Sequence, residues 1–235
     1  MSGCAWCLPG TTTNTEALGD NAPWGTLGAT KGIFMRTSVH RGIFCAALAV
    51  GTVIASGGTA SAAANLVKNG SFEKPIVPAG SFQNFAMGQS FTGWKVVGAP
   101  GVVSVVSGTF QSQGFTFNAK VGAQWIDLTG PGSKTATGVA QSVATIPGTT
   151  YQLTFWVGNI NDPGGIFGVS STVKVLVNGV KKLTAVNSLH PTNHKQAWKE
   201  FSLTITATSS HTRISFINGD PSTDDSNGLD AVHMS

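Results

Sequence analysis

The chain has 235 residues, of which 10% are charged, 41% are hydrophobic and 30 are glycine. Low charge with many small polar residues is typical of a β-protein rich in turns, and excludes a chain that is disordered throughout. The formal net charge is +4, and apart from Lys181 and Lys182 the basic residues are scattered, so nucleic-acid binding is not expected.

The first 64 residues are not expected to belong to the folded domain. A basic stretch (35–41), an apolar run (43–54) and small residues (60–64) follow one another, which predicts a secretory signal peptide over residues 35–64. Residues 1–34 precede this signal and are predicted to be an extension outside the native protein, with Met35 as the initiator. The apolar run is too short for a membrane span, and no second one follows. We therefore expect a secreted domain over residues 65–235.

The three cysteines support export only weakly. All of them, Cys4, Cys7 and Cys45, precede residue 65. Cys4 and Cys7 have the spacing of a redox motif, but no strand precedes them and no helical pattern follows, so we interpret the spacing as accidental.

After residue 64 the chain reads as a succession of short strands. Each apolar or alternating run is bounded by turn residues, and residues 81–90 read as a loop. A short opening strand is predicted from residue 65 to the break at Asn69-Gly70. Further strands are predicted at 91–97, 102–106, 121–128, 137–146, 151–157, 171–177, 180–185, 198–207, 211–217 and 229–233.

Asn178-Gly179 lies between two of these runs and is the strongest hairpin signal in the chain. About ten short strands without a helical stripe predict an all-β, two-sheet sandwich in a single domain.

Strand alternation assigns a face to several aromatic residues. If Ile126 and Leu128 face the core, Trp125 and Asp127 face away from it, and by the same test Trp156 lies opposite Leu153 and Phe155. An exposed Trp can stack on a sugar ring while a polar side chain bonds the hydroxyls.

The predicted ligand-binding residues are Trp125, Asp127, Gln141 and Trp156. The alternative is that the loop 81–90 covers this face and makes either Trp a core residue.

Familiar catalytic patterns are absent from the sequence after residue 64. There is no Gly-x-Ser-x-Gly elbow and no Cys, so a nucleophilic hydrolase is not expected. His190 and His194 are four residues apart, but Pro191 prevents the helix that would align them on a metal. The segment 220–228 is acidic, and we interpret it as a solvated loop.

The two ends of the domain are predicted to meet. Glu73 follows an apolar stretch near the start of the domain, and Asp230 lies within one near its end. The two carboxylates could share a cation. The alternative is that Glu73 caps a loop by accepting backbone N–H bonds and Asp230 pairs with a Lys.

Five motifs in order carry a family resemblance across residues 65–235: Asn-Leu-Val-x-Asn-Gly-Ser-Phe-Glu at 65–73, Gly-Trp at 93–94, Ile-Asp-Leu-Thr-Gly at 126–130, Pro-Gly-Thr-Thr-Tyr at 147–151 and Leu-Asp-Ala-Val at 229–232. The chain resembles the bacterial choice-of-anchor C proteins and the plant cell-wall family of domain-of-unknown-function 642, which have galactose-binding-like β-sandwich domains.

The resemblance implies a jelly roll and places Trp94 and Trp198 in its core. It also implies a structural Ca²⁺ held by Glu73 and Asp230, with Asn69 and Ser71 as further candidate ligands.

The function expected from these observations is a secreted, monomeric, non-catalytic protein that binds polysaccharide or cell-wall glycan at the bacterial cell surface. The alternatives are an extracellular structural or protein-interaction module, and less favoured, a hydrolase. The sequence stops at Ser235 without the sorting tail typical of choice-of-anchor proteins, so we expect free secretion.

Overall fold

The computed structural model describes residues 64–131 and 135–235. The predicted extension (1–34) and all but the last residue of the predicted signal peptide lie outside these residues. No helix in the described part of the chain has the length and apolar character needed to cross a bilayer.

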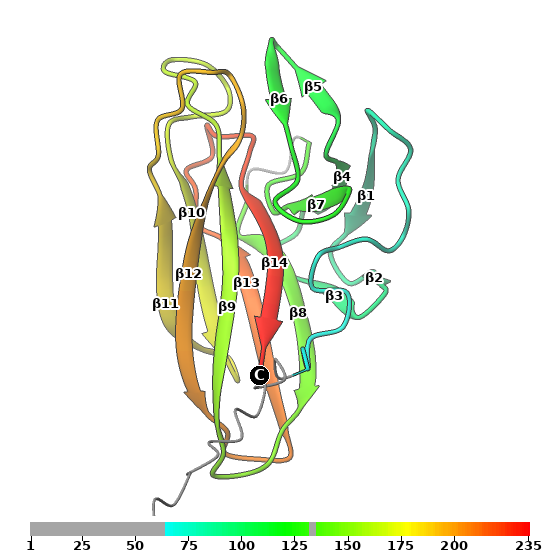
Figure 1. Ribbon diagram of the computed structural model, residues 1–235, viewed down its shortest axis with the longest axis vertical. Helices are drawn as coiled ribbons and strands as arrows, with labels where there is room; N and C mark the ends of the chain where they lie inside the picture. The colour runs from blue at the N-terminus through cyan, green and yellow to red at the C-terminus, as the bar shows by residue number, and fades with distance from the viewer. Residues whose placement is uncertain (1–63, 132–134) are drawn as a thin grey trace, which may run out of the picture. The chain divides into compact units, whose positions relative to one another are not determined.

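Two six-stranded antiparallel sheets make up the sandwich, and a separate two-stranded hairpin stands at one end of it (Figure 1). Sheet A contains, in spatial order, β1 (Phe82–Ala86), β4 (Val102–Ser107), β7 (Gln124–Asp127), β14 (Gly228–Met234), β9 (Thr150–Asn159) and β12 (Ala197–Thr206). Sheet B contains β11 (Val180–Asn187), β10 (Ser171–Val177), β13 (His211–Asn218), β8 (Thr137–Ala144), β3 (Trp94–Gly98) and β2 (Ser90–Phe91). The hairpin consists of β5 (Phe110–Ser112) and β6 (Phe115–Phe117). The predicted fold class, an all-β two-sheet sandwich, is confirmed.

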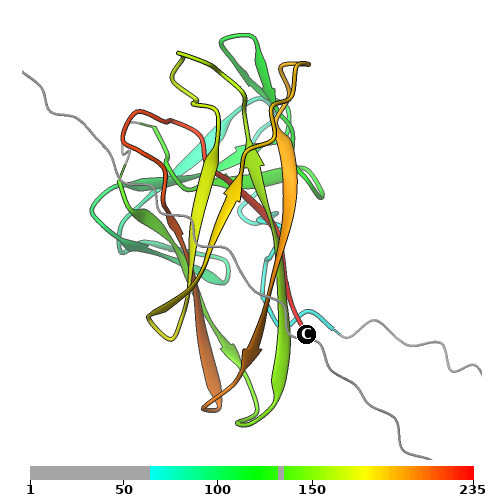
Figure 2. The same ribbon diagram turned by 90° about the vertical axis from the view of Figure 1, so that its left-hand side faces the viewer.

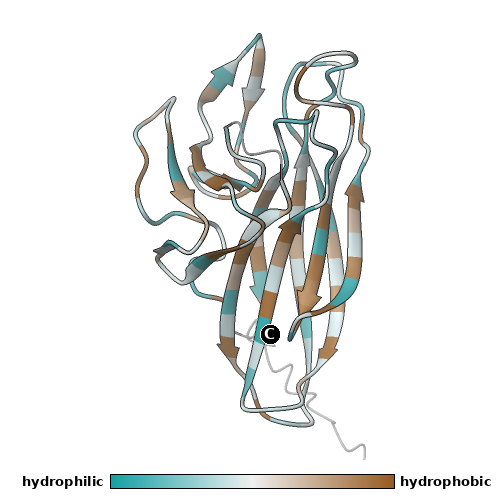
Figure 3. Cartoon of the chain, turned by 180° about the vertical axis from the view of Figure 1, so that it is seen from behind, coloured by the Kyte–Doolittle hydropathy of each residue, from teal (hydrophilic) through white to brown (hydrophobic). Residues whose placement is uncertain are grey.

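The core lies between the two sheets and follows the alternation of the strands. Along β9 the residues Tyr151, Leu153, Phe155 and Val157 are buried while Gln152 is exposed, and apolar and polar bands alternate along the long strands in Figure 3. Such alternation arises because successive side chains of a strand point to opposite faces.

Aromatic contacts join the two sheets across this core. Phe155 of sheet A meets Phe216 of sheet B edge-on at 5.0 Å between ring centroids, and Trp94 meets the same Phe216 at 6.1 Å. Trp94 therefore lies in the core, as predicted.

The hairpin predicted at Asn178-Gly179 is confirmed. Both residues have positive φ, 49° and 84°, and they connect Val177 of β10 to Val180 of β11. This backbone conformation matches the twist of paired strands and suits Asn-Gly.

The two ends of the domain meet, as predicted, although the residues before Asn69-Gly70 do not form the predicted strand and residues 68–71 form a turn. The backbone N–H of Val232 donates to the carbonyl of Gly70 at 2.9 Å, and that of Leu66 to Met234 at 2.9 Å. A Cβ on Gly70 would lie 2.0 Å from the Val232 carbonyl oxygen, so this approach requires glycine. The first described residues accordingly lie beside the C-terminus in two views at right angles (Figures 1 and 2).

Three strands escaped prediction. β1 lies within the segment interpreted as a loop, and pairs with β4 from Phe82↔Val106 to Ala86↔Val102. β5 and β6 turn at Gln113-Gly114, where both residues have positive φ. Of these three, β6 also bonds to a distant segment, because Thr116 exchanges backbone hydrogen bonds with His194 and Gln196.

Candidate functional site

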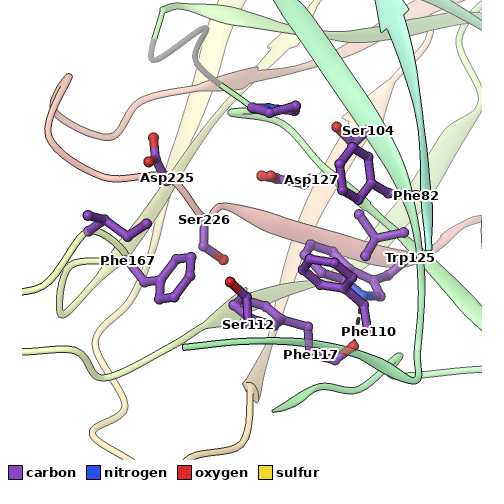
Figure 4. A pocket seen from close by; sticks show the side chains of 13 residues that line it. Phe82, Ser104, Phe110, Ser112, Phe117, Trp125, Asp127, Phe167, Asp225 and Ser226 are labelled. Carbon is purple, nitrogen blue, oxygen red and sulfur yellow. Dashed lines mark hydrogen bonds between the residues drawn. The ribbon is translucent and has the colours of Figure 1, made fainter. Parts of the chain in front are cut away.

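A pocket of about 220 Å³ opens at the end of the sandwich that carries the β5–β6 hairpin (Figure 4). Its floor comes from β4 and β7, one wall from the hairpin, and the other wall from the loops after β9 and β13. The lining residues are Phe82, Ser104, Val106, Phe110, Ser112, Phe117, Trp125, Asp127, Pro131, Ile166, Phe167, Asp225 and Ser226. No Lys, Arg or His occurs among these described residues.

Trp125 forms the apolar floor of this pocket. Its side chain is only 2% exposed, its Nε1 donates to the Phe117 carbonyl at 3.0 Å, and its ring stacks on that of Phe117 at 6.1 Å. Trp198 meets it edge-on at 6.1 Å, with Nε1 bonded to the carbonyl of Asn118.

The expectation that Trp125 is exposed is therefore wrong, and the alternative of a covered, core-like Trp holds. The cover comes mainly from the hairpin and from Phe167. The segment 81–90, which was expected to supply it, contributes only Phe82, which lines the pocket and meets Phe110 edge-on. The residues Val106, Phe117, Trp125, Ile160 and Phe167 form a second hydrophobic cluster, separate from the core between the sheets. Trp198, which was expected in the main core, is partly buried and packs against this second cluster.

Asp127 lies two residues after Trp125 on β7, on the same face of the strand, and the residue is 8% exposed. Figure 4 shows its oxygens pointing toward the side of the pocket occupied by Ser226 and Asp225. Burial raises the pKa of Asp127 to about 6, although hydrogen bonds from Thr129, Asn227 and Gly130 oppose the rise. The group can therefore hold a proton near neutral pH.

Gln141 lies away from this pocket. It points to the inner side of β8 and binds the backbone of Lys68, accepting from its N–H at 2.7 Å and donating to its carbonyl at 2.9 Å. Its role in the structure is to attach the opening segment of the domain to sheet B.

Trp156 also lies apart, half-buried on β9, with the Nζ of Lys120 3.6 Å from its ring centroid. Of the four predicted ligand-binding residues, the structure brings together only Trp125 and Asp127.

Several pocket residues were not predicted as site residues: Phe110, Phe117, Phe167 and Asp225. The only signal for them in the sequence is the density of Phe between residues 110 and 117. Nothing local relates those residues to the loops at 162–168 and 220–227.

The two acids predicted to bind Ca²⁺ hold the same loop, the stretch that leads into β7. Glu73 Oε1 accepts the N–H groups of Ala123 and Gln124 at 3.0 and 3.1 Å. Asp230 Oδ2 accepts those of Lys120 and Val121 at 2.8 and 3.0 Å. The capping role considered for Glu73 is thus observed, whereas Asp230 bonds backbone and not a Lys ammonium.

The two carboxyls lie close enough to repel each other. Burial raises the pKa of Asp230 to about 7, and the charge of Glu73 adds to the rise. A divalent cation would offset both effects, and in this respect the pair suits Ca²⁺. Both oxygens of Asp230 already accept backbone N–H groups, Oδ2 from Lys120 and Val121 and Oδ1 from Ala231.

Of the other two candidate ligands, Asn69 is engaged within its own turn, and Ser71 lies in the same turn. The side chain of Asn69 closes its own turn through bonds to Lys74 and Thr92, and its carbonyl accepts the Nε1 of Trp94. No cluster of three or more metal-ligating His, Cys, Asp or Glu occurs within residues 64–131 and 135–235.

A family model described as HpiC1-like, HpiC1 cyclase, matches residues 63–234. The chain belongs to this cyclase family. The resemblance to choice-of-anchor C and domain-of-unknown-function 642 proteins is therefore wrong, as are the predictions of a non-catalytic protein and of a glycan as its partner.

Solved structures with related architecture include two cyclases and carbohydrate-binding modules. The Stig cyclase Fisc from Fischerella sp. TAU, in complex with (3Z)-3-(1-methyl-2-pyrrolidinylidene)-3H-indole, is 20% identical, with a TM-score of 0.49 over 74% of this chain and 97% of that one. A cyclase from the same organism in complex with 4-(1H-indol-3-yl)butan-2-one is 19% identical, with a TM-score of 0.48 over 74% of this chain and 97% of that one. A family 35 carbohydrate-binding module from Clostridium thermocellum is 11% identical, with a TM-score of 0.39 over 65% of this chain and 97% of that one. No curated protein matches the sequence.

Proposed function

We propose that this protein is a cyclase that closes a ring in a compact, aromatic, apolar substrate, with Asp127 as the proton donor. The observation that carries the proposal is a buried carboxyl facing a pocket lined mainly by apolar side chains, five of them aromatic. Membership of the cyclase family supports it.

The chemistry requires no co-reactant. Transfer of the Asp127 proton to an unsaturated carbon of the substrate leaves a cation, a neighbouring double bond or ring attacks that cation to form the new bond, and loss of a proton restores the acid. A donor with a pKa of about 6 is suited to this work at neutral pH, because both of its protonation states are populated.

The pocket lining also favours a developing positive charge. The faces of Trp125, Phe117 and Phe167 can stabilise a cation, and no positively charged side chain among the described lining residues opposes it. Asp225 on the opposite wall adds a second carboxyl that can neutralise the cation or accept the final proton. An anionic substrate is disfavoured by the same two carboxyls.

The first test is turnover of a panel of indoles that carry unsaturated side chains. Ring closure of this kind gives products of unchanged mass and altered retention, which liquid chromatography with mass spectrometry detects. The change Asp127→Asn keeps the shape of the side chain and removes the acid, so we expect the rate to fall by roughly 10²-fold or more. Glu200→Gln, at an exposed position on β12, is the matched control.

A loss of turnover in Asp225→Asn but not in Asp127→Asn would reverse the roles of the two acids. Full activity in both variants would contradict acid catalysis in this pocket.

We also propose that Ca²⁺ binds at Glu73 and Asp230 as a structural ion. The support is the closeness of two carboxyls, one of them buried, at the loop that leads into β7. Calcium readily combines such carboxylates with backbone carbonyls and water.

We further propose that the protein is secreted, on the basis of the signal-peptide pattern over residues 35–64.

A further inference from the structure

Three hydrogen bonds to the carboxyl of Asp127 converge on one of its two oxygens, and the backbone N–H of Gly130 interacts with the same carboxyl. Oδ1 accepts the backbone N–H of Thr129 at 3.0 Å, the hydroxyl of Thr129 at 2.7 Å and the backbone N–H of Asn227 at 3.0 Å. A carboxyl oxygen with three donors has no capacity left to carry a proton itself. The proton of the neutral acid therefore belongs on Oδ2.

Thr129 makes two of these three bonds, and its buried position prevents a water molecule from replacing its hydroxyl. It lies two residues after Asp127, at the point where β7 ends, and its side chain is fully buried. Water cannot replace the hydroxyl at a buried site of this kind without new space.

The third donor is fixed from the other sheet. Asn227 is also fully buried, and its Nδ2 donates to the carbonyl of Thr172 on β10 and to Oδ1 of Asn218 on β13 at 2.7 Å. Asp127 is thus held between Thr129 on its own segment and an anchor attached to sheet B.

We propose that Thr129 is a positioning residue for the proton donor: its hydroxyl holds Oδ1 and so presents Oδ2 to the pocket. Its importance for the reaction rests on the proposed function. The arrangement of donors around Oδ1 does not depend on that function, and can be tested without a substrate.

Whether loss of the Thr129 hydroxyl raises or lowers the pKa of Asp127 depends on which form of the carboxyl the hydroxyl stabilises. A donor to the carboxylate favours the ionised form, and the Thr129 hydroxyl accordingly lowers the pKa of Asp127 against the rise caused by burial. Removing the hydroxyl should raise that pKa further. Three other titratable groups face this region: Asp225 in the pocket wall, Asp220 and Asp224. The charges of Asp127 and Asp224 both raise the pKa of Asp220.

The experiment is a carboxyl-carbon NMR titration of the full chain labelled with ¹³C-aspartate, with the Asp127 signal assigned through Asp127→Asn. In Thr129→Val we expect the pKa of Asp127 to rise by about one unit, the size of effect that a bond to a charged group produces. Thr129→Ser keeps the hydroxyl and should titrate like the parent. Thr212→Val, at another fully buried Thr whose hydroxyl faces Thr145, is the control for loss of a buried hydroxyl elsewhere.

Thr129→Ala supplies the same test if the valine variant does not fold, because it removes the hydroxyl and adds no methyl group beside Asp127. An unchanged or lowered pKa in the variant without the hydroxyl, or a shift in Thr129→Ser as large as in Thr129→Val, would overturn the proposal. Intact turnover in Asp127→Asn together with the predicted titration shift would refute the proposed role of Asp127 as proton donor and leave the positioning in place.

Discussion

Trp125 and Asp127 show how two residues on one strand face can acquire a role that neither has alone. Alternation places both on the side of β7 that points away from the sandwich core. The rings of Phe117 and Phe167 then cover that side, so that Trp125 becomes a floor and Asp127 a desolvated acid. The same carboxyl on an open sheet face would keep an ordinary pKa, because water would solvate its charge.

The buried setting of Trp125 and the half-exposed setting of Trp156 predict different costs of truncation. Trp125→Ala should lower the free energy of unfolding by about 3–5 kcal/mol, because it empties a packed cluster and removes the bond to the Phe117 carbonyl. Trp156→Ala should cost only about 1 kcal/mol, the scale of an exposed contact with Lys120. Urea unfolding of both variants measures the difference, and equal losses would contradict the assignment of Trp125 to the second cluster.

At the scale of elements, β7 depends on the loop that precedes it. Glu73 and Asp230, which come from the two ends of the domain, accept four backbone N–H groups between residues 120 and 124. Gly122 in the same loop has a φ of 72°, and a Cβ there would lie 2.3 Å from Glu73 Oε1, so the loop requires glycine to pass this close. The junction between the two ends of the domain therefore fixes the start of β7, which forms part of the pocket floor.

A calcium ion at this junction should stabilise the whole domain. Ligand at about 100 times its dissociation constant adds roughly 2.7 kcal/mol if it binds only the folded state. We expect a chelator to lower the melting temperature of the protein by several degrees, a response that Glu73→Ala and Asp230→Ala should abolish and Glu200→Ala should retain. Differential scanning calorimetry with and without chelator tests this expectation.

Both Glu73→Ala and Asp230→Ala also remove hydrogen bonds to the loop, so lower stability in these variants does not by itself indicate calcium. The decisive comparison is the response to chelator. A parent protein with the same melting curve in calcium and in chelator would leave these acids with their capping role alone.

At the scale of the whole molecule, the sandwich supplies a stable base and one of its ends supplies the site. The pocket residues come from β4, β7, the β5–β6 hairpin and the loops at 162–168 and 220–227. Loops placed on a rigid scaffold can vary without loss of the core, which is how one architecture carries different functions. The sandwich alone therefore did not distinguish a cyclase from a carbohydrate-binding protein.

Export is a property of the whole chain that the described residues do not test. The signal-peptide pattern predicts that the exported protein begins between Ala63 and Asn65. Mass spectrometry of secreted protein from the native host should give this N-terminus. Secreted material that retained residues 1–34 would contradict both the cleavage site and the assignment of Met35 as initiator.

The motifs at 65–73 and 229–232 do what was expected of them, because they bring the two ends of the domain together. They describe a junction of the fold, however, and the pocket lies among other residues. A resemblance based on such motifs supports an architecture and leaves the function undecided.

The sequence by itself determined most of the strands, the Asn178-Gly179 hairpin and the face on which Trp125 and Asp127 lie, because these depend on the two-residue period and on turn residues next to one another in the chain. Only the tertiary structure decided what covers that face. The hairpin with Phe110 and Phe117, the loop with Phe167 and the loop with Asp225 come together through long-range packing, and this packing removes water from Asp127. Alternation specifies the direction of a side chain, but desolvation depends on its neighbours from distant segments. Those contacts turned an expected sugar-binding surface into a largely apolar pocket with a buried acid.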